Sequence, residues 1–249
     1  MMPTRIEWCD ETWNPFAGCT PYSAGCENCY AAKMAHRLAG MEATKARYAG
    51  LTTARAHWNG ELRLFDDEIV KGYDRFNKMK RPRKIFIGSM GDIFHDKMPT
   101  SFIDKILEVV SALSQHQFMI LTKRAHNIEN KLYGITPENG CRSLGGGDYY
   151  PNLWLGITAE NQEALIERLP YLMKVPAAKR FISVEPMLSA VSLPVNCGVD
   201  LVICGPETGA KRRPCKRMWI EDLRDNCSGR GIKFLMKAAA YKILSPLKN

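Results

Sequence analysis

Three cysteines in one short loop, Cys19, Cys26 and Cys29, have the clearest potential for chemistry. Thiolates are soft ligands that suit iron–sulfur clusters, and three of them leave one iron of a four-iron cluster open to bind another molecule. Pro21 and Gly25 favour turns that let the sulfurs converge. The loop therefore predicts a cluster site with an open iron, and a helical pattern begins directly after Cys29.

Zinc is the competing interpretation of this loop. A structural zinc site takes four cysteine or histidine ligands, and Cys9 or His36 would complete such a set. A disulfide is disfavoured, because the chain begins without an apolar signal segment, which predicts a reducing compartment. The chain has nine cysteines, so they cannot all pair. From the loop alone, a cluster and zinc are equally favoured.

Bulk composition is that of a soluble globular protein. The chain has 249 residues, of which 45% are hydrophobic and 24% are charged, and no run is long enough to cross a membrane. We therefore expect a cytoplasmic protein with no membrane partner. The net charge of +9 favours a polyanionic partner, above all nucleic acid. A protein with a basic surface and no such partner would have the same net charge.

Short apolar runs alternate with helical patterns along the chain. Such runs are typical of strands buried on both faces of a parallel sheet, and intervening helices indicate β/α units. We predict an α/β fold: a partial (β/α)6-type parallel barrel in one domain, 1–249. A helical insertion is expected over about 58–83 and a glycine-rich lid over about 134–152. The expected strands lie near 12–16 and at 85–89, 118–122, 153–157, 180–184, 201–205 and 233–237.

Polar side chains follow nearly every predicted strand. The carboxyl ends of parallel strands meet at one rim, where parallel β/α folds place their reactive groups. A single residue of this kind would more often cap a helix, but here five successive strands bring a carboxylate or a cation to the same rim. The residues concerned are Ser89, Asp92, Thr122, Lys123, Glu160, Asn161, Ser183, Glu185, Glu207 and Lys237.

On these motifs the chain resembles a radical S-adenosylmethionine enzyme. It is more closely similar to a phage-associated three-cysteine family long catalogued as a domain of unknown function, and it shares a Tyr after the last cluster cysteine and a Thr-Lys pair with spore photoproduct lyases. The first cysteine gap, of six residues, is that of the phage-associated family. The matching segments are EWCDETWNPFAGC (7–19), CENCYA (26–31), GSMGDIFH (88–95), ILTKR (120–124), LGITAEN (155–161), FISVEP (181–186) and ICGPETG (203–209).

The resemblance implies two cofactors and an external one-electron reductant. Cys19, Cys26 and Cys29 would bind a [4Fe–4S] cluster whose open iron chelates S-adenosylmethionine. Lys123 would pair with the methionine carboxylate, and Asp92 or Ser89 would contact the amine. The remaining expected cofactor contacts, which the sequence does not order, are Thr122, Glu160, Asn161, Ser183 and Glu185.

Three further side chains are candidate catalytic groups. A thiol at the site can return a hydrogen atom to a product radical, and Cys204 and Cys141 are the candidates, although inert buried thiols are common. Lys237 ends the last predicted strand. The residues expected to bind substrate are Tyr30, Glu207, Lys211, Arg212 and Arg213.

The resemblance and the basic stretch 211–217 favour a DNA nucleobase or a modified nucleotide as substrate. We expect hydrogen abstraction that serves base modification, such as isomerisation of an amino-acid-modified thymine, or base repair. A phage-encoded protein would act in the cytoplasm of a bacterial host. Two alternatives stay open. One is a radical enzyme acting on a small nucleotide or phosphate metabolite, and the other is a non-enzymatic nucleic-acid-binding protein that contains zinc.

Overall fold

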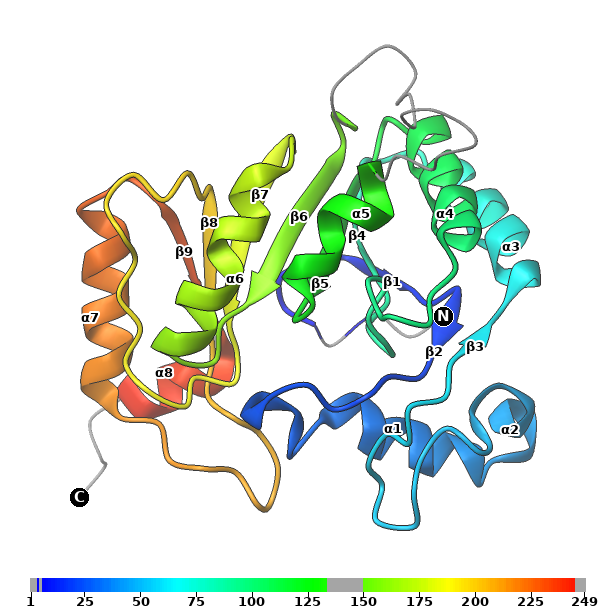
Figure 1. Cartoon of the computed structure of the whole chain (residues 1–249), viewed down its shortest axis with the longest axis horizontal. Helices are drawn as coiled ribbons and strands as arrows, with labels where there is room; N and C mark the ends of the chain where they lie inside the picture. The colour runs from blue at the N-terminus through cyan, green and yellow to red at the C-terminus, as the bar shows by residue number, and fades with distance from the viewer. Residues whose placement is uncertain (1–3, 5, 134–149, 245–249) are drawn as a thin grey trace.

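A seven-stranded parallel sheet forms the centre of the molecule (Figure 1). The computed structural model describes residues 4, 6–133 and 150–244. Every neighbouring pair of strands in this sheet is parallel, and β1 and β9 form its two edges, which confirms the predicted partial parallel barrel. In spatial order the strands are β1 (Glu11–Trp13), β4 (Lys84–Ile87), β5 (Gln117–Thr122), β6 (Leu153–Thr158), β7 (Lys179–Val184), β8 (Leu201–Cys204) and β9 (Lys233–Met236).

Helices connect the strands, and those from α3 onward cover the outer face of the sheet, whereas α1 and α2 pack on each other in a separate cluster (Figure 1). Neighbouring contacts between α3 and α4, α4 and α5, and α5 and α6 join them into a continuous layer. None of the described helices is long and apolar enough to cross a membrane. The helices are α1 (Tyr30–Ala39), α2 (Glu42–Tyr48), α3 (Asp66–Asn77), α4 (Thr100–Ala112), α5 (Ile128–Tyr133), α6 (Gln162–Lys174), α7 (Arg217–Ser228) and α8 (Ala238–Leu244), with short 3-10 turns η1 (Ala24–Cys26) and η2 (Ala125–Asn127).

Two predicted elements differ from the structure. The first predicted strand is split into β1 and β2 (Phe16–Ala17), because Pro15 between them has no N–H to donate to a sheet. β2 pairs instead with β3 (Arg63–Leu64) in a separate antiparallel pair. The insertion expected to be helical over 58–83 contains β3 as well as a helix, and the helix is α3 alone. Residues 134–149 of the expected lid lie outside the described residues.

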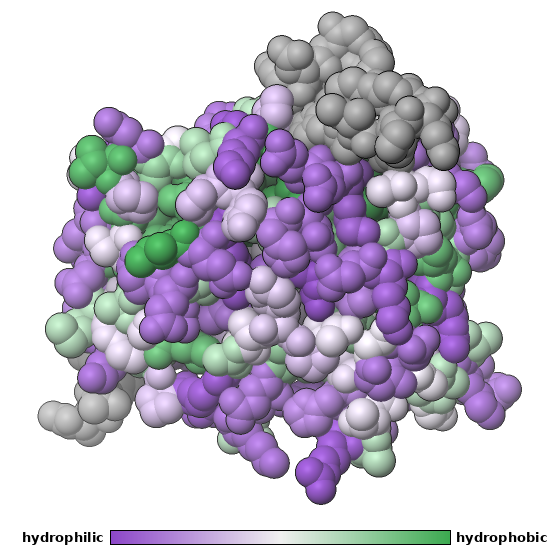
Figure 2. All heavy atoms as spheres, viewed as in Figure 1, coloured by the Kyte–Doolittle hydropathy of each residue, from purple (hydrophilic) through white to green (hydrophobic). Residues whose placement is uncertain are grey.

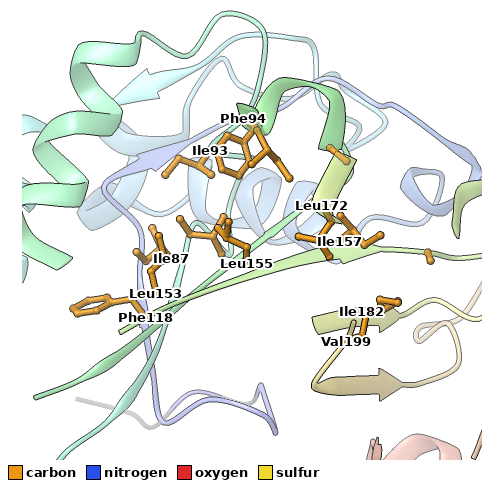
Figure 3. Packing of buried hydrophobic residues seen from close by; sticks show 14 of the residues in the cluster. Ile87, Ile93, Phe94, Phe118, Leu153, Leu155, Ile157, Leu172, Ile182 and Val199 are labelled. Carbon is orange, nitrogen blue, oxygen red and sulfur yellow. The ribbon is translucent and has the colours of Figure 1, made fainter. Parts of the chain in front are cut away.

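Alternate residues of each strand face opposite sides of the sheet, as the strand period of two requires. The outer-face residues, such as Phe118, Leu155 and Ile182, pack under the helices in one large hydrophobic cluster (Figure 3). The inner face carries a second, smaller cluster that includes Met119 and Phe181. Nearly every strand therefore buries both faces, which explains its almost continuous apolar sequence.

Trp8, from the segment before β1, fills the inner face of the sheet. Its ring centroid lies 4.5 Å from that of Phe86 on β4 and 5.9 Å from that of Phe181 on β7. The Phe181 ring in turn lies over Gly156 on β6, where a Cβ atom would sit 2.4 Å from the ring. This packing leaves the strand ends as the accessible part of the inner face.

We predict that Gly156→Ala destabilises the fold by about 1–3 kcal/mol, because the added methyl group overlaps a buried ring that has little room to move. Gly40→Ala is the matched control: its Cβ would meet only the Arg37 carbonyl oxygen, at 3.5 Å, and should change stability by about 0.5 kcal/mol or less. Chemical denaturation measures both. Equal stability of the two variants would contradict the packing described here.

Candidate functional site

A cavity lies between the cysteine loop and the carboxyl ends of β4, β5 and β6. All three loop cysteines line it, together with Ser89 and Lys123 from the strand ends. Its volume is about 130 Å³, and it is partly open to solvent. Phe86 and Leu121, on the inner face of the sheet, form part of its apolar lining. The sequence correctly predicted that these segments come together.

Two glycines bring the cysteine loop into contact with the loop that follows β4. Gly18 donates its N–H to the Met90 carbonyl oxygen at 3.0 Å and forms an isolated bridge with Gly91. A Cβ at Gly91 would lie 2.7 Å from the Gly18 oxygen, and Gly18 has a φ of 107° that disfavours any other residue. Cys19 follows directly, so this close approach places its thiol at the cavity.

Arg124 is a site residue that the sequence prediction did not include, although it follows Thr122 and Lys123 directly. It is 2% exposed, and its guanidinium lies 3.6 Å from the Cys19 sulfur and donates to the Thr20 carbonyl oxygen at 2.8 Å. Burial raises the pKa of the Cys19 thiol to about 12, an effect that nearby Asp92 reinforces and Arg124 opposes. Arg124 therefore supplies the positive charge that a thiolate at Cys19 requires.

Backbone groups surround the other two loop thiols. The Tyr22 N–H lies 3.4 Å from the Cys26 sulfur and donates to it. Cys29 is the N-cap of α1, where the positive end of the helix dipole favours an anionic sulfur. None of the described cysteines is in a disulfide. No three described His, Cys, Asp or Glu side chains converge on a point that would hold one metal ion. The ligands of a cluster bind different irons, so their sulfurs need not converge in that way.

Protein groups already satisfy Asp92, one of the two expected contacts for the cofactor amine. It accepts hydrogen bonds from the Phe94 N–H at 3.0 Å, the Thr122 hydroxyl at 2.7 Å and the Lys123 N–H at 3.1 Å. Asp92 and Thr122 therefore fix the turn after β5. Asp92, Thr122 and Ser89 all line the cavity, and the Ser89 hydroxyl donates to the Asn14 side-chain oxygen at 3.1 Å.

Glu160 and Asn161, after β6, also have structural partners. Glu160 is buried and pairs with buried Arg168 at 2.8 Å. Burial favours its protonated form, but hydrogen bonds from Arg168 outweigh this and hold the pKa of Glu160 below its ordinary value. The Asn161 side chain caps α6 by accepting from the Ala164 N–H at 2.8 Å. This is the capping role that the sequence analysis weighed as the alternative.

The inner face also carries polar groups at the ends of β7 and β9. Ser183 is buried on β7, on the same face as Phe181. Glu185 and Lys237 form an ion pair that spans β8. The Lys237 side chain passes close to Gly205, where an added Cβ atom would lie 3.1 Å from it. These groups lie on the inner side of the sheet but do not line the cavity that the cysteines share.

Cys204 faces away from the inner side of the sheet, contrary to its predicted place on the active rim. It is on the same face of β8 as Val202, fully buried in the outer cluster, and its sulfur lies 3.7 Å from the Met187 sulfur. Burial raises the pKa of this thiol above its usual range. Strand alternation, applied to the apolar run itself, would have indicated this orientation. Cys141 lies outside the described residues.

The segment after β8 binds the cysteine loop, which the sequence did not indicate. Arg213, expected to contact substrate, instead pairs with Glu207 and with Glu27 at 3.1 Å, and donates to the Ala24 carbonyl oxygen at 2.9 Å. The Asn28 side chain donates to Glu207 at 3.0 Å. We call this set, Glu207, Arg213, Glu27, Asn28 and the Ala24 carbonyl, the loop clasp. It leaves Glu207 and Arg213 engaged with the protein rather than free for substrate.

The remaining residues expected to bind substrate are Tyr30, Lys211 and Arg212, and all three are exposed. Tyr30 lines the cavity, is 54% exposed, and donates its hydroxyl to the Ser89 carbonyl oxygen at 3.0 Å. Lys211 and Arg212 are exposed. Of the residues expected to bind substrate, Tyr30 is therefore the one that the structure places in the wall of the cysteine cavity.

The chain belongs to the family described as "Protein of unknown function (DUF5131)", whose model matches residues 3–243. Two similar solved structures are of spore photoproduct lyase. A mutant with bound AdoMet and dinucleoside spore photoproduct is 12% identical, covering 94% of this chain and 59% of that one, with a TM-score of 0.48. Another mutant is 12% identical, covering 98% of this chain and 62% of that one, with a TM-score of 0.49. The chain thus spans about three fifths of these proteins. No curated protein matches it.

We predict that Arg213→Ala loosens the cysteine loop and destabilises the protein by about 1–3 kcal/mol, because buried Glu207 loses its main partner. Hydrogen exchange of the 24–28 amides should accelerate. Arg212→Ala is the matched control, since the one hydrogen bond of its guanidinium is a 3.5 Å contact with the Gly209 carbonyl oxygen. Equal exchange rates in both variants would show that the clasp does not hold the loop.

The loop clasp should also weaken in acid. Burial would raise the pKa of Glu207, but hydrogen bonds from Arg213 and Asn28 outweigh it and hold this pKa below its ordinary value. The clasp's stabilisation is therefore complete above about pH 4.3, the pKa of an unfolded glutamate, and is lost as the pH falls through the lower folded value.

Proposed function

We propose that the chain is a single-domain radical S-adenosylmethionine enzyme in which Cys19, Cys26 and Cys29 hold a [4Fe–4S] cluster. The observation that carries this proposal is the shared cavity: three thiols of one loop face the carboxyl ends of a parallel sheet. The surroundings fit such a cluster. N–H groups of Arg124 and Tyr22 donate toward the sulfurs of Cys19 and Cys26, as expected for thiolate ligands.

The same cavity has the groups that a second, zwitterionic cofactor needs. Lys123 follows Leu121 on the inner face and lines the cavity, so its ammonium group is suited to bind a carboxylate there. The Ser89 hydroxyl is the better candidate for an amine contact than Asp92, whose oxygens are already engaged. Thr122 also lines the cavity, with its hydroxyl bound to Asp92. Glu160 and Asn161 are outside the cavity lining, and Ser183 and Glu185 lie farther along the inner face.

When bound, the cluster and S-adenosylmethionine together supply a 5′-deoxyadenosyl radical, with one electron from an external reductant. The protein's part is to orient and to exclude water. Trp58, Phe86 and Leu121 give the cavity apolar walls that shield a reactive species from solvent. Tyr30 lies in the cavity wall, with its hydroxyl fixed to the Ser89 carbonyl oxygen.

For the substrate we propose a DNA nucleobase or a base substituent, with a reaction of the isomerase or lyase type. The support is the +9 net charge and the motif resemblance to phage-associated and DNA-repair radical enzymes. A small nucleotide substrate is the second candidate, favoured by the limited size of the cavity. Anaerobic incubation with S-adenosylmethionine, reductant and modified DNA, followed by nucleoside mass spectrometry, tests the choice.

Replacing Cys19, Cys26 or Cys29 with Ala should abolish iron and sulfide binding and the formation of 5′-deoxyadenosine, because each thiol binds a separate iron. Cys9→Ala and Cys215→Ala are the controls and should keep the cluster, since neither residue lines the cavity. Iron analysis and absorbance spectra measure the outcome. Loss of iron from Cys9→Ala would replace the open-iron model with a four-cysteine cluster, and one zinc per chain would favour the non-enzymatic alternative.

Lys123→Met should weaken S-adenosylmethionine binding at least about tenfold, because a charge-assisted contact to a carboxylate is worth roughly 1.5–3 kcal/mol. Lys71→Met is the control, because Lys71 is an exposed residue of α3 that pairs with Asp67. Equilibrium binding to the reconstituted protein provides the measurement. An unchanged affinity in Lys123→Met would rule out the carboxylate contact.

A further inference from the structure

The exposed face of α1 combines cations with an aromatic ring beside the cavity. Helical spacing places Tyr30, Lys33 and Arg37 on one face. Tyr30 is 54% exposed, and Lys33 and Arg37 are also exposed. The opposite face of the helix, with Ala31 and Ala35, is buried. α1 therefore presents a polar, cationic surface that begins at the cavity wall.

The cations on this face have no carboxylate partner among the described residues. The Lys33 ammonium approaches the Asn28 side-chain oxygen at 3.5 Å, and the Arg37 guanidinium contacts the Met34 sulfur at 2.9 Å. Cations on the next two helices differ, because Lys45 pairs with Glu42 and Lys71 with Asp67. Charge on α1 is thus available to an external anion, whereas Lys45 of α2 and Lys71 of α3 each pair with a carboxylate of their own helix.

The cationic surface continues onto the segment after β8. Asn28 contacts Lys33 through its side-chain oxygen and donates its amide N–H to the Lys211 carbonyl oxygen at 3.1 Å. Lys211 is exposed and, within the described residues, forms no ion pair. We call Tyr30, Lys33, Arg37 and Lys211 the α1 ridge. In Figure 1, α1 and the segment between β8 and α7 lie along the same edge of the molecule, and Figure 2 shows hydrophilic side chains along that edge.

We propose that the α1 ridge binds a single-stranded or locally opened nucleic-acid strand and leads one of its bases into the cavity. This rests on the proposed function. Lys33 and Arg37 are one helical turn apart, about 6 Å along the axis, which suits successive phosphates of a strand. The Tyr30 ring, held by its hydroxyl at the cavity wall, offers a stacking surface for a base.

A strand, rather than an intact duplex, fits the geometry. The cavity is recessed between the cysteine loop and the sheet, so a base paired inside a duplex would not reach its lining. Contacts through phosphates and one aromatic ring provide affinity without reading sequence. The ridge therefore accounts for entry of a base, while selection among bases is left to the cavity.

The test compares two triple variants with the same change in charge. The ridge variant is Lys33→Gln, Arg37→Gln and Lys211→Gln. The control is Lys78→Gln, Lys80→Gln and Arg81→Gln, three exposed residues that precede β4 at the opposite, amino end of the sheet. Fluorescence anisotropy with a labelled single-stranded oligothymidylate measures affinity over a range of salt concentrations. Thermal unfolding shows whether both variants are folded.

We expect the ridge variant to lose at least about tenfold in affinity and its salt slope to fall by about 2, since each phosphate contact on a single strand contributes roughly 0.7. The control should keep the wild-type slope. Equal losses in both variants would show that binding follows net charge and would overturn the ridge. Competition by thymidine monophosphate as effective as that by the oligonucleotide would overturn it too, in favour of a small nucleotide substrate.

This measurement does not require the cluster. A protein that binds the oligonucleotide through the ridge but forms no 5′-deoxyadenosine would contradict the proposed function and leave the ridge standing. A protein that cleaves S-adenosylmethionine but binds oligonucleotides equally well with and without the three cations would contradict the ridge alone.

Discussion

The contact between the Gly18 and Gly91 backbones is the constraint on which the site depends. It joins the cysteine loop to the loop after β4 at a distance that no side chain would allow. Arg124 strengthens the same junction, because it holds the Thr20 carbonyl and approaches the Cys19 sulfur. The thiols thereby face the ends of the strands, and the sheet becomes the floor of a cavity instead of a solvent-exposed edge.

Buried charge in this protein serves mainly to hold loops. Arg124 and Arg168 are almost completely buried, and each pairs with a carboxylate from a strand end. Removing one partner of such a pair leaves an uncompensated charge, so each pair is more costly to break than an exposed one. Each of these buried pairs is neutral, so the net charge of +9 is carried by the other charged residues of the chain.

Patterns close together in sequence predicted the fold well. Apolar runs of about five residues located the strands, and strand polarity placed the carboxyl ends of β4, β5 and β6 around one cavity. One contact could not be predicted from the sequence. The loop clasp joins Arg213 to Glu27, residues 186 apart in the chain, and neither has a local signature. The orientation of Cys204 was accessible from alternation, but its position at a strand end suggested a role that its side chain does not support.

The loop clasp also joins two segments across the open side of this barrel. β1 and β9 are both edges of the sheet, and the loop clasp bridges the gap between segments that follow β2 and β8. A barrel closed by paired strands can widen only by breaking a ladder of backbone hydrogen bonds. Here the seam is made largely of side-chain contacts, so its width can change while every strand keeps its partners. The backbone pairing of the sheet and the spacing of the two clasped segments are therefore set by different interactions.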